Sequence, residues 1–590
     1  MDIAQKLIKL RKWLEKENLA GFLVPLSDPY QNEFVLPAYN RLKWLTGFGG
    51  SAGFCIVSQT KAALFVDGRY TEEAKQTIDP ALFSLHPYTY SDIVSWLRTS
   101  TPKKGMIGFD PWIHPATQIS HFQEKLASQL QFVACSSNPI DTLWEDRPAL
   151  PKEPCFLLSE KYTGESAQAK RIRLGKALAE KGADAHLIID APSLNWLLNI
   201  RGHDLPYTPV IMSYGLLTSN GKVNIFGTLD QYPLAIRQAL GDDISFFPTQ
   251  SLLDHLTSYK NLLLPLAHTP YAIQAHLSNH NIAFTWGDDL CTLPKALKNK
   301  VEQEGFRQAH LLDGNALTRF LSFLDKHQGS LDLTESSAAT LLETYRRASS
   351  HLQGLSFPTI SAVGANSALP HYQPRQDSDI RLRDNTMYLV DSGGQYKTGT
   401  TDVTRTIFLG PTPSPEQKKH YTLVLKGHIA LASAIFPSGT SGIQLDMLAR
   451  QPLLQEGLEY NHGTGHGVGH FLNVHEGPQG ISPRANPHVS LQPGMILSNE
   501  PGFYEAGAYG IRLENMILVK KAIVKNAKTS LLAFETLTLA PMARTLIEIK
   551  MLTQEEKNWL NTYHKKVWLH LAPLLPEEDA LWLKKACTPF

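Results

Sequence analysis

The chain has 590 residues, of which 43% are hydrophobic and 19% are charged, and its formal net charge is +1. This length suggests three or four domains with ample core. A net charge near zero argues against a nucleic-acid-binding surface, and no apolar run is long enough to span a bilayer, so we expect neither nucleic acid nor a membrane as a partner. The five scattered cysteines, an odd number, predict free thiols in a reducing cytoplasm.

The first half of the chain contains a repeated pattern. Residues 4–18 carry Leu7, Leu10 and Leu14 at helical spacing and precede a short apolar strand at 20–25. The pattern recurs in a helix at 168–180, with Ile172, Leu174 and Leu178 as its apolar positions, and in a strand at 185–189. A Trp-Leu motif follows each strand, at 44–48 and 196–202. We therefore predict two related α/β domains. Breaks at the Pro/Lys-rich stretch 148–154 and near residue 300 place the domains at 1–150, 151–300 and 301–590.

The third domain begins and ends with predicted helices. Residues 301–323 have apolar and small residues at helical spacing, which predicts one long helix. Residues 559–582 have a helical pattern and carry many large apolar side chains, within a C-terminal extension of about 548–590. Part of this apolar set must pack on the third domain, and the remainder favours an interface between subunits.

Two acidic pairs carry the chemical signal of the third domain. Asp391 follows an apolar strand and Asp402 precedes another, with a glycine-containing stretch between them. Glu500 and Glu514 repeat the arrangement around Gly507. Hairpin folding predicts that each pair lies directly opposite across two strands, with Cβ atoms roughly 5 Å apart. Four converging carboxylates would repel strongly, and two divalent cations would cancel their charge.

A glycine-histidine segment lies between the two acidic pairs. Residues 462–470 contain too many glycines for an ordinary helix or strand interior, and glycines let the backbone approach a ligand closely. Four histidines fall within fourteen positions, which favours a functional site: His462, His466, His470 and His475. Carboxylate oxygens with one imidazole suit manganese, cobalt, zinc or iron.

These motifs resemble the Xaa-Pro aminopeptidases (aminopeptidase P), in the large three-domain form, of the metallopeptidase family that shares the pita-bread fold. The resemblance covers the whole chain, and its most specific motifs are residues 391–393, 399–406, 462–469, 473–478, 499–504 and 510–515. It implies an α/β (α+β) chain with two related creatinase-N-like α/β domains before a C-terminal pita-bread catalytic domain. It also implies a homodimer formed through the catalytic domain.

The resemblance further implies roles for individual residues. One metal would be held by Asp391 and Asp402 and the other by His466, with Asp402, Glu500 and Glu514 shared between them. The two divalent metal ions, with Mn²⁺ favoured, would carry a bridging hydroxide that attacks the peptide. Glu500, His371 and His475 would be catalytic, with Glu500 as the general base. The substrate-binding residues would be His371, His462, His475, Tyr504 and Arg512.

The implied function is removal of the first residue from peptides with proline in second position. Three alternatives stay open at this point. A creatinase-type hydrolase shares the fold but not the metal ligands, which are all present in this chain. A prolidase, which cleaves Xaa-Pro dipeptides, shares the metal ligands but typically lacks two preceding domains of this kind. Some pita-bread domains are non-enzymatic binding modules, but those have generally lost ligands, whereas the set in this chain is complete.

Overall fold

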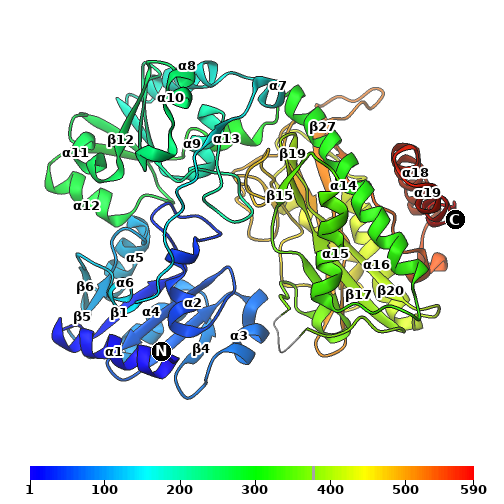
Figure 1. Cartoon of the computed structure of the whole chain (residues 1–590), viewed down its shortest axis with the longest axis horizontal. Coiled ribbons are helices and arrows are strands. Elements are labelled where there is room, and N and C mark those ends of the chain that lie inside the picture. Colours follow the sequence, from blue (N-terminus) through cyan, green and yellow to red (C-terminus); the bar gives the residue numbers. More distant parts are fainter. Residues whose placement is uncertain (375–378) are drawn as a thin grey trace. The chain divides into compact units, whose positions relative to one another are not determined.

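The computed structural model of the chain describes residues 1–374 and 379–590, which form two compact units (Figure 1). One unit comprises Met1–Ser159 and Glu165–Thr292, and the other comprises Glu160–Gly164 and Leu293–Phe590. None of the described helices has the length and apolar composition needed to cross a bilayer.

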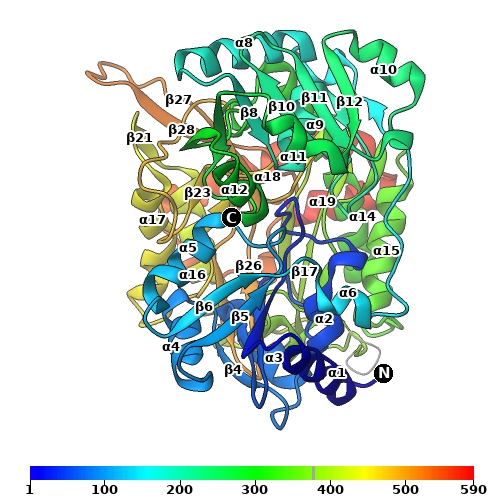
Figure 2. The same ribbon diagram turned by 90° about the vertical axis from the view of Figure 1, so that its left-hand side faces the viewer.

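The first unit contains two six-stranded sheets of the same topology. The strand orders are β4-β3-β2-β1-β5-β6 and β12-β11-β10-β8-β13-β14. In each sheet the central strand has one antiparallel and one parallel neighbour, and both edge strands pair in parallel. The predicted repeat of two related α/β domains is therefore confirmed, and Figure 2 shows β10, β11 and β12 side by side.

The strands of both sheets are short and mostly apolar. Those of the first are β1 (Gly21–Pro25), β2 (Gly53–Ser58), β3 (Ala62–Val66), β4 (Ser84–Pro87), β5 (Gly105–Phe109) and β6 (Leu130–Ala134). Those of the second are β8 (Ala185–Ile188), β10 (Tyr214–Thr218), β11 (Val223–Gly227), β12 (Ile244–Pro248), β13 (Asn261–Pro265) and β14 (Ala283–Gly287).

The helix that opens each half of the repeat lies where the sequence predicts it. Helix α1 (Ile3–Lys16) buries Leu7, Leu10 and Leu14, as its spacing predicts. Helix α8 (Ala167–Glu180) buries Leu174 and Leu178, but Ile172, expected on the apolar face, is 43% exposed. Lys170 is buried on this helix, and its ammonium group donates to Trp196 O and Asn199 Oδ1 at 2.9 and 2.8 Å.

The other helices of the first unit connect the strands. After the first opening helix they are α2 (Arg41–Thr46), α3 (Thr71–Thr77), α4 (Tyr90–Ser100), α5 (Ala116–Leu126) and α6 (Pro139–Leu143). After the second they are α9 (Ala191–Leu198), α10 (Leu234–Leu240), α11 (Leu252–Leu256) and α12 (Tyr271–Asn279).

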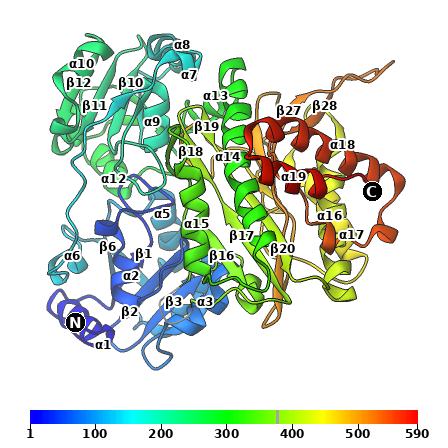
Figure 3. The same ribbon diagram turned by 45° about the vertical axis from the view of Figure 1, so that its right-hand side comes forward.

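In the second unit, two pairs of helices each cover a sheet. Helix α14 (Lys300–Lys326), the predicted long helix, packs with α15 (Glu335–Arg347) on the sheet β16-β17-β20 through one apolar cluster (Figure 3). Helices α16 (Pro415–Ala432) and α17 (Gly442–Leu454) pack on the sheet β21-β28-β27-β24 through another.

The strands of these two sheets contain or adjoin the acidic residues of the predicted metal site. The first sheet comprises β16 (Ile360–Val363), β17 (Thr386–Ser392) and β20 (Val403–Leu409). The second comprises β21 (Ile435–Pro437), β24 (Ile496–Asn499), β27 (Asn515–Lys521) and β28 (Leu531–Thr536). Shorter pieces complete the unit: β15 (Leu352–Leu355), β18 (Gly394–Tyr396), β19 (Gly399–Thr400), β22 (Gly465–His466), β23 (Gly480–Ile481), β25 (Gly502–Glu505) and β26 (Tyr509–Arg512).

The C-terminal region forms the predicted helices, α18 (Gln554–Leu571) and α19 (Glu577–Ala586). Part of its apolar set lies in a core cluster with residues of α16 and of the β25–β26 hairpin, namely Leu560, Tyr563, Val567, Leu571 and Leu583. Another part faces outward: Leu569, Leu574 and Leu581 are 58%, 50% and 62% exposed. The third domain therefore covers only some of the apolar side chains that the sequence places there.

Candidate metal centre

The first acidic pair lies on one hairpin, but not directly opposite. Strands β17 and β20 are antiparallel, and Asp391 pairs with Thr404 rather than with Asp402, which is offset by two residues. The prediction of direct opposition is wrong because the turn is centred one residue further along the chain than the midpoint between the two aspartates. Gln395 pairs with Thr400, so the turn falls at residues 397–398 and not at the glycines. A diagonal offset of this kind still keeps two side chains within reach of a shared ligand.

The second acidic pair has the predicted register. Asn499 pairs with Asn515 and Gly502 with Arg512, and both pairs belong to one antiparallel register, so Glu500 lies opposite Glu514. Gly507 is at the tip, with φ of +77°, a conformation that glycine adopts without the steric cost of a side chain. The hairpin therefore confirms that both glutamates are presented from neighbouring strands.

Close backbone packing sets the position of His466. A Cβ atom on Gly465 would lie 2.1 Å from Ser498 O, and one on Gly467 would lie 2.1 Å from Glu476 O. Both positions therefore require glycine. His466 Nδ1 lies 3.0 Å from Gly467 O, an acceptor, so this nitrogen carries the proton. Nε2 is then left with a lone pair, which is the state that binds a metal.

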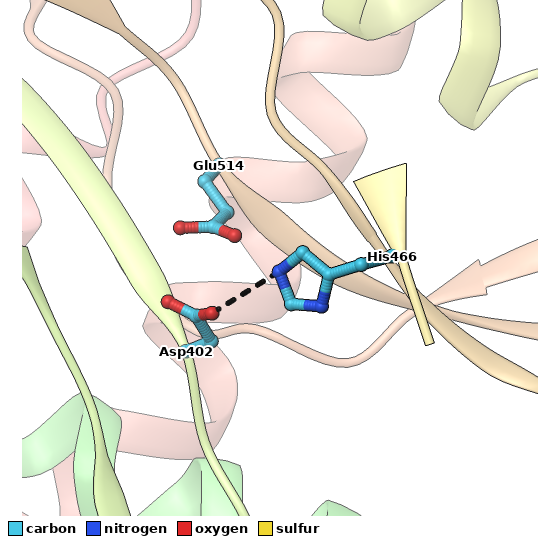
Figure 4. Close-up of side chains that lie close together, drawn as sticks. All are labelled: Asp402, His466 and Glu514. Carbon is cyan, nitrogen blue, oxygen red and sulfur yellow. Dashed lines mark ion pairs between the residues drawn. The ribbon is translucent and has the colours of Figure 1, made fainter. Parts of the chain in front are cut away.

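The carboxylates of Asp402 and Glu514 lie close to this imidazole (Figure 4). His466 Nε2 lies 3.5 Å from Asp402 Oδ2 and 3.6 Å from Glu500 Oε1. One ligand atom from each of Asp402, His466 and Glu514 lies within 4.8 Å of the others, a spacing at which three groups can share a cation. The three come from segments far apart in the sequence, which only the folded chain brings together.

Burial and mutual repulsion oppose ionisation of these carboxylates. Burial, and then the neighbouring charges of Asp391 and Glu500, raise the pKa of Asp402 well above its ordinary value. Burial, and then the charges of Asp402, Asp391 and Glu500, do the same to the pKa of Glu514. Burial also raises the pKa of Glu500, against the attraction of His466. The neighbouring side chains therefore do not supply enough positive charge to balance these carboxylates when they are ionised.

The donor set fits divalent cations. Asp391 Oδ1 and Asp402 Oδ1 are buried, and within the described residues neither has a hydrogen-bond partner. A buried carboxylate oxygen without a donor is costly, and a cation removes that cost. Residues that would hold metal are those expected from the sequence: Asp391, Asp402, His466, Glu500 and Glu514. Their roles as ligands stay predictions.

A chain of hydrogen bonds runs from the cluster along the β25–β26 hairpin. Arg512 Nη2 lies 2.6 Å from Asp391 Oδ2, so the guanidinium pairs with this carboxylate. Arg512 Nη1 donates to the Tyr504 hydroxyl at 2.8 Å, and that hydroxyl lies 2.8 Å from His462 Nε2. His462 Nδ1 is 2.7 Å from Gly463 O, so Nε2 is the acceptor of the Tyr504 proton. Burial raises the pKa of Tyr504 to about 12, so its hydroxyl keeps this proton at neutral pH.

The other expected site histidines lie at different depths around the cluster. The His475 ring is centred 4.3 Å from that of His466, nearly perpendicular to it. His371 is half-buried and follows the 3₁₀ helix η5 (Gly364–Ala368), which Ser367 Oγ holds to β26 by accepting from Gly510 N at 2.7 Å. His470 instead packs its ring against Phe306 of α14. The catalytic and binding roles of His371, His462 and His475 stay predictions.

Two hydroxyl groups orient the glutamates, a role that only the folded chain shows. Thr404 Oγ1 donates to Glu514 Oε2 at 2.8 Å, and Ser498 Oγ lies 3.4 Å from Glu500 Oε1. Thr404 and Glu514 are 110 residues apart in the sequence, so no local pattern links them. Thr404 lies within the motif 399–406 and Ser498 lies two residues before Glu500, but neither position indicates which carboxylate the hydroxyl contacts.

An arginine behind Asp391 is equally hidden from sequence reasoning. Arg346 donates to Ser392 Oγ at 3.0 Å and pairs with Asp313, and all three side chains are buried. Arg346 lies 46 residues before Ser392, on a helix whose pattern indicates only an amphipathic face. The ion pair therefore supports the strand that carries Asp391 from a part of the chain that the motifs do not include.

Known proteins match every part of the chain. Residues 304–521 match Metallopeptidase family M24, and residues 6–143 and 146–302 each match the Creatinase/Prolidase N-terminal domain. Residues 530–590 match the C-terminal region of peptidase M24. A probable Xaa-Pro aminopeptidase P from Coprinopsis cinerea is 37% identical, over 100% of this chain and 99% of its own length.

Solved structures agree with the sequence matches. An X-prolyl aminopeptidase from Caenorhabditis elegans, described as a cytosolic enzyme with a di-nuclear active site, has a TM-score of 0.95 and 35% identity, with 100% of both chains covered. An Xaa-Pro dipeptidase from Bacillus anthracis is 25% identical with a TM-score of 0.53, and that match covers 64% of this chain and 99% of the dipeptidase.

Fold and site together define a peptidase of the pita-bread class, preceded by two creatinase-like domains, as the fold class predicted from the sequence requires. The chain belongs to the Xaa-Pro aminopeptidase P group of metallopeptidase family M24.

The raised carboxyl pKa values predict how pH and metal act on stability. Folding raises the pKa of Asp402 and Glu514, so the folded state binds protons more tightly than the unfolded chain. In metal-free protein their contribution to stability should be fully present below the ordinary carboxyl pKa of about 4, and should be lost as pH rises through the raised values. Because metals bind ionised carboxylates, Mn²⁺ should raise the unfolding temperature more at neutral than at acidic pH.

Thermal unfolding with and without Mn²⁺ at the two pH values measures this. The double variant Asp402→Asn/Glu514→Gln is the control, since it should flatten the pH dependence and lose the gain from metal. An equal gain at both pH values in the unaltered protein would contradict the analysis of these two carboxylates.

Proposed function

We propose that this chain is a dinuclear-metal aminopeptidase that hydrolyses the N-terminal Xaa-Pro bond of peptides. The observation that carries the proposal is the carboxylate-imidazole cluster, found in a chain that matches an X-prolyl aminopeptidase over its full length. The match to a dipeptidase covers only 64% of this chain, so a prolidase is the second candidate. A non-enzymatic binding module is less well supported, because the acidic and imidazole groups converge.

Two divalent ions, with Mn²⁺ favoured, are part of the proposal. Bound at this cluster, such cations would act as Lewis acids and would lower the pKa of water from 15.7 toward about 7. The oxygen-rich donor set with one imidazole supports manganese, although cobalt, zinc and iron prefer similar ligands.

The chain's own residues would handle protons and orientation. Glu500, with Ser498 Oγ at 3.4 Å, would take the proton of the attacking water as general base. His475, beside His466, would donate to the scissile carbonyl oxygen as negative charge develops on it, and His371 would assist. Arg512 would hold Asp391 in place while Tyr504 and His462 line the substrate side of the β25–β26 hairpin.

Preference for proline has a physical reason. An Xaa-Pro bond is a tertiary amide with a rigid ring and no N–H, so a site for it needs apolar or aromatic walls and no acceptor for that hydrogen. The ring of Tyr504 and the histidines around the cluster supply such walls in this proposal.

Peptide length separates aminopeptidase from prolidase. We expect Mn²⁺-loaded protein to release arginine from Arg-Pro-Pro, to leave the matched peptide Arg-Ala-Pro uncut, and to cleave Arg-Pro poorly. Chromatography of the products measures all three, and EDTA should abolish release. Faster cleavage of the dipeptide than of the tripeptide would favour a prolidase, and activity that survives chelation would overturn the proposal.

Removal of the Glu500 carboxylate should stop turnover. Glu500 would be both ligand and base, so Glu500→Ala should lower kcat by more than the roughly 10²–10⁴-fold typical of losing a general base. Glu505→Ala is the matched control, since Glu505 is an exposed glutamate on the same hairpin. Both variants should keep the circular dichroism spectrum of the parent protein. An active Glu500→Ala enzyme would refute the assignment.

We also propose a cytoplasmic location and a homodimer. None of the five cysteines forms a disulfide, which suits a reducing compartment, and the Caenorhabditis elegans relative is described as cytosolic. The exposed leucines of the C-terminal region support a two-fold contact through the catalytic domain, since twofold dimers are the commonest soluble assembly.

Charge placed on those leucines should dissociate the dimer. We expect the parent protein to have about twice the chain mass of 65.7 kDa by sedimentation, and Leu569→Glu/Leu581→Glu to have the single-chain mass. Leu234→Glu is the control, because Leu234 is 69% exposed on α10 of the other unit. A parent protein of single-chain mass would defeat the proposal, as would loss of the dimer in the control.

A further inference from the structure

A tyrosine of the C-terminal region reaches the strands that carry the metal centre. Tyr563, on α18, is 4% exposed, and Trp559 stacks on its ring with centroids 5.3 Å apart. Its hydroxyl donates to Ala540 O at 2.8 Å and accepts from Arg405 Nη2 at 3.0 Å. A phenylalanine ring would fill this part of the apolar core equally well, so the hydrogen bonds of the hydroxyl distinguish tyrosine at this position.

Arg405 connects Tyr563 to both hairpins of the site by hydrogen bonds. It lies on β20 and is 1% exposed, and in the part of the chain that the structure describes its partners are uncharged. Nη1 donates to Thr404 O at 2.8 Å and to Glu514 O at 2.7 Å. Burying a guanidinium without a carboxylate partner costs free energy of desolvation. The presence of Arg405 here therefore indicates that its planar set of N–H donors is needed to bind several acceptors at once.

The two carbonyls that Arg405 joins belong to residues of the acidic cluster. Glu514 presents a candidate ligand carboxylate, and Thr404 Oγ1 donates to that same carboxylate at 2.8 Å. Glu514 N also donates to Thr404 O at 3.2 Å. Arg405 therefore fixes the spacing of β20 and the second hairpin at the point where Glu514 is aimed.

A second branch fixes the strand on the far side of Glu514. Arg405 Nη2 donates to Asn515 Oδ1 at 2.8 Å, and Asn515 Nδ2 lies 3.0 Å from His428 Nε2. Burial lowers the pKa of His428 to about 3, so its ring is neutral and Nε2 accepts. The carbonyl of His428 accepts from Asn499 Nδ2 at 2.9 Å. Asn499 and Asn515 flank Glu500 and Glu514 in the sequence, so both glutamates are held from behind.

We propose that Tyr563, acting through Arg405, is a positioning residue for Glu514. The C-terminal region would then help to set the affinity of the catalytic domain for divalent metal, in addition to any part in assembly. This inference rests on the proposed function, because it assumes that the acidic cluster binds metal. In this proposal α18 affects metal affinity through Tyr563, in addition to its apolar packing.

Metal affinity of the folded protein tests the inference without recourse to turnover. Mn²⁺ is titrated by calorimetry into metal-free protein, at a temperature well below the unfolding midpoint of each variant. Arg405→Lys keeps the charge but loses the fork, and we expect its Kd for Mn²⁺ to rise by about 10–100-fold, as for other residues that orient ligands. Tyr563→Phe keeps the ring, and we expect a smaller rise, of about threefold or more, because Arg405 keeps its other acceptors.

Val567→Ala is the matched control, since Val567 is fully buried on the same helix and contributes only apolar contact. It should lower the unfolding temperature and leave the Kd unchanged. An equal loss of affinity in this control, or an unchanged Kd in folded Tyr563→Phe, would overturn the inference. If Arg405→Lys does not fold, Tyr563→Phe alone decides. Failure of the unaltered protein to bind Mn²⁺ would instead overturn the proposed function and the inference together.

Discussion

Repulsion among buried carboxylates is the constraint on which this site depends. Burial and mutual charge raise the pKa of Asp402 and Glu514, and two of the buried oxygens lack a donor within the described residues. A protein core does not keep such a group ionised without compensation. The surrounding structure supplies only part of it, through Arg512 at Asp391 and Thr404 at Glu514. The positive charge that is still missing would come from bound cations, and this need gives the site its affinity for them.

The fold answers this constraint with antiparallel hairpins from two different sheets. Each hairpin brings two acidic residues together by local pairing, and β20 then lies beside the second hairpin through the bonds of Thr404 and Thr406 to residues 512 and 514. Glycines at 465 and 467 allow the histidine segment to lie against this framework at backbone distance. The site therefore uses rigid strands for the acids and a closely packed segment for the imidazole, an arrangement that keeps ligands in place before metal arrives.

How much of this could be predicted from the sequence depends on the range of each interaction. The register of Glu500 and Glu514 follows from a short loop with a single glycine at its centre, and the repeat of two α/β domains follows from local helix and strand patterns. The offset of Asp391 and Asp402 escapes such reasoning because residues 397–398 form the turn without glycine, while the nearby glycines lie in or beside the strands. The burial of Lys170 also escapes such reasoning, because its acceptors Trp196 O and Asn199 Oδ1 lie more than twenty residues away in the sequence.

The residues behind the glutamates could not be predicted for a related reason. Arg405 and Tyr563 are 158 residues apart, and each has an ordinary local pattern, a strand residue in one case and an apolar helix face in the other. Nothing in either segment specifies the other. Their meeting depends on how α18 packs on the third domain, which is a property of the assembled core.

The tip of the β25–β26 hairpin has a consequence for how this protein can vary in length. A Cβ atom added to Gly507 would have no neighbour within 4 Å among the described residues, and the residues beside it are exposed, whereas every residue from 510 to 516 is buried. An insertion of one residue in the strands would turn Glu514 to the opposite face of the hairpin. An insertion at the tip would leave the strand register intact. Residues 506–508 are thus a suitable position for inserting a fluorescent or affinity peptide, because the hydrogen bonds between the two strands would be unchanged.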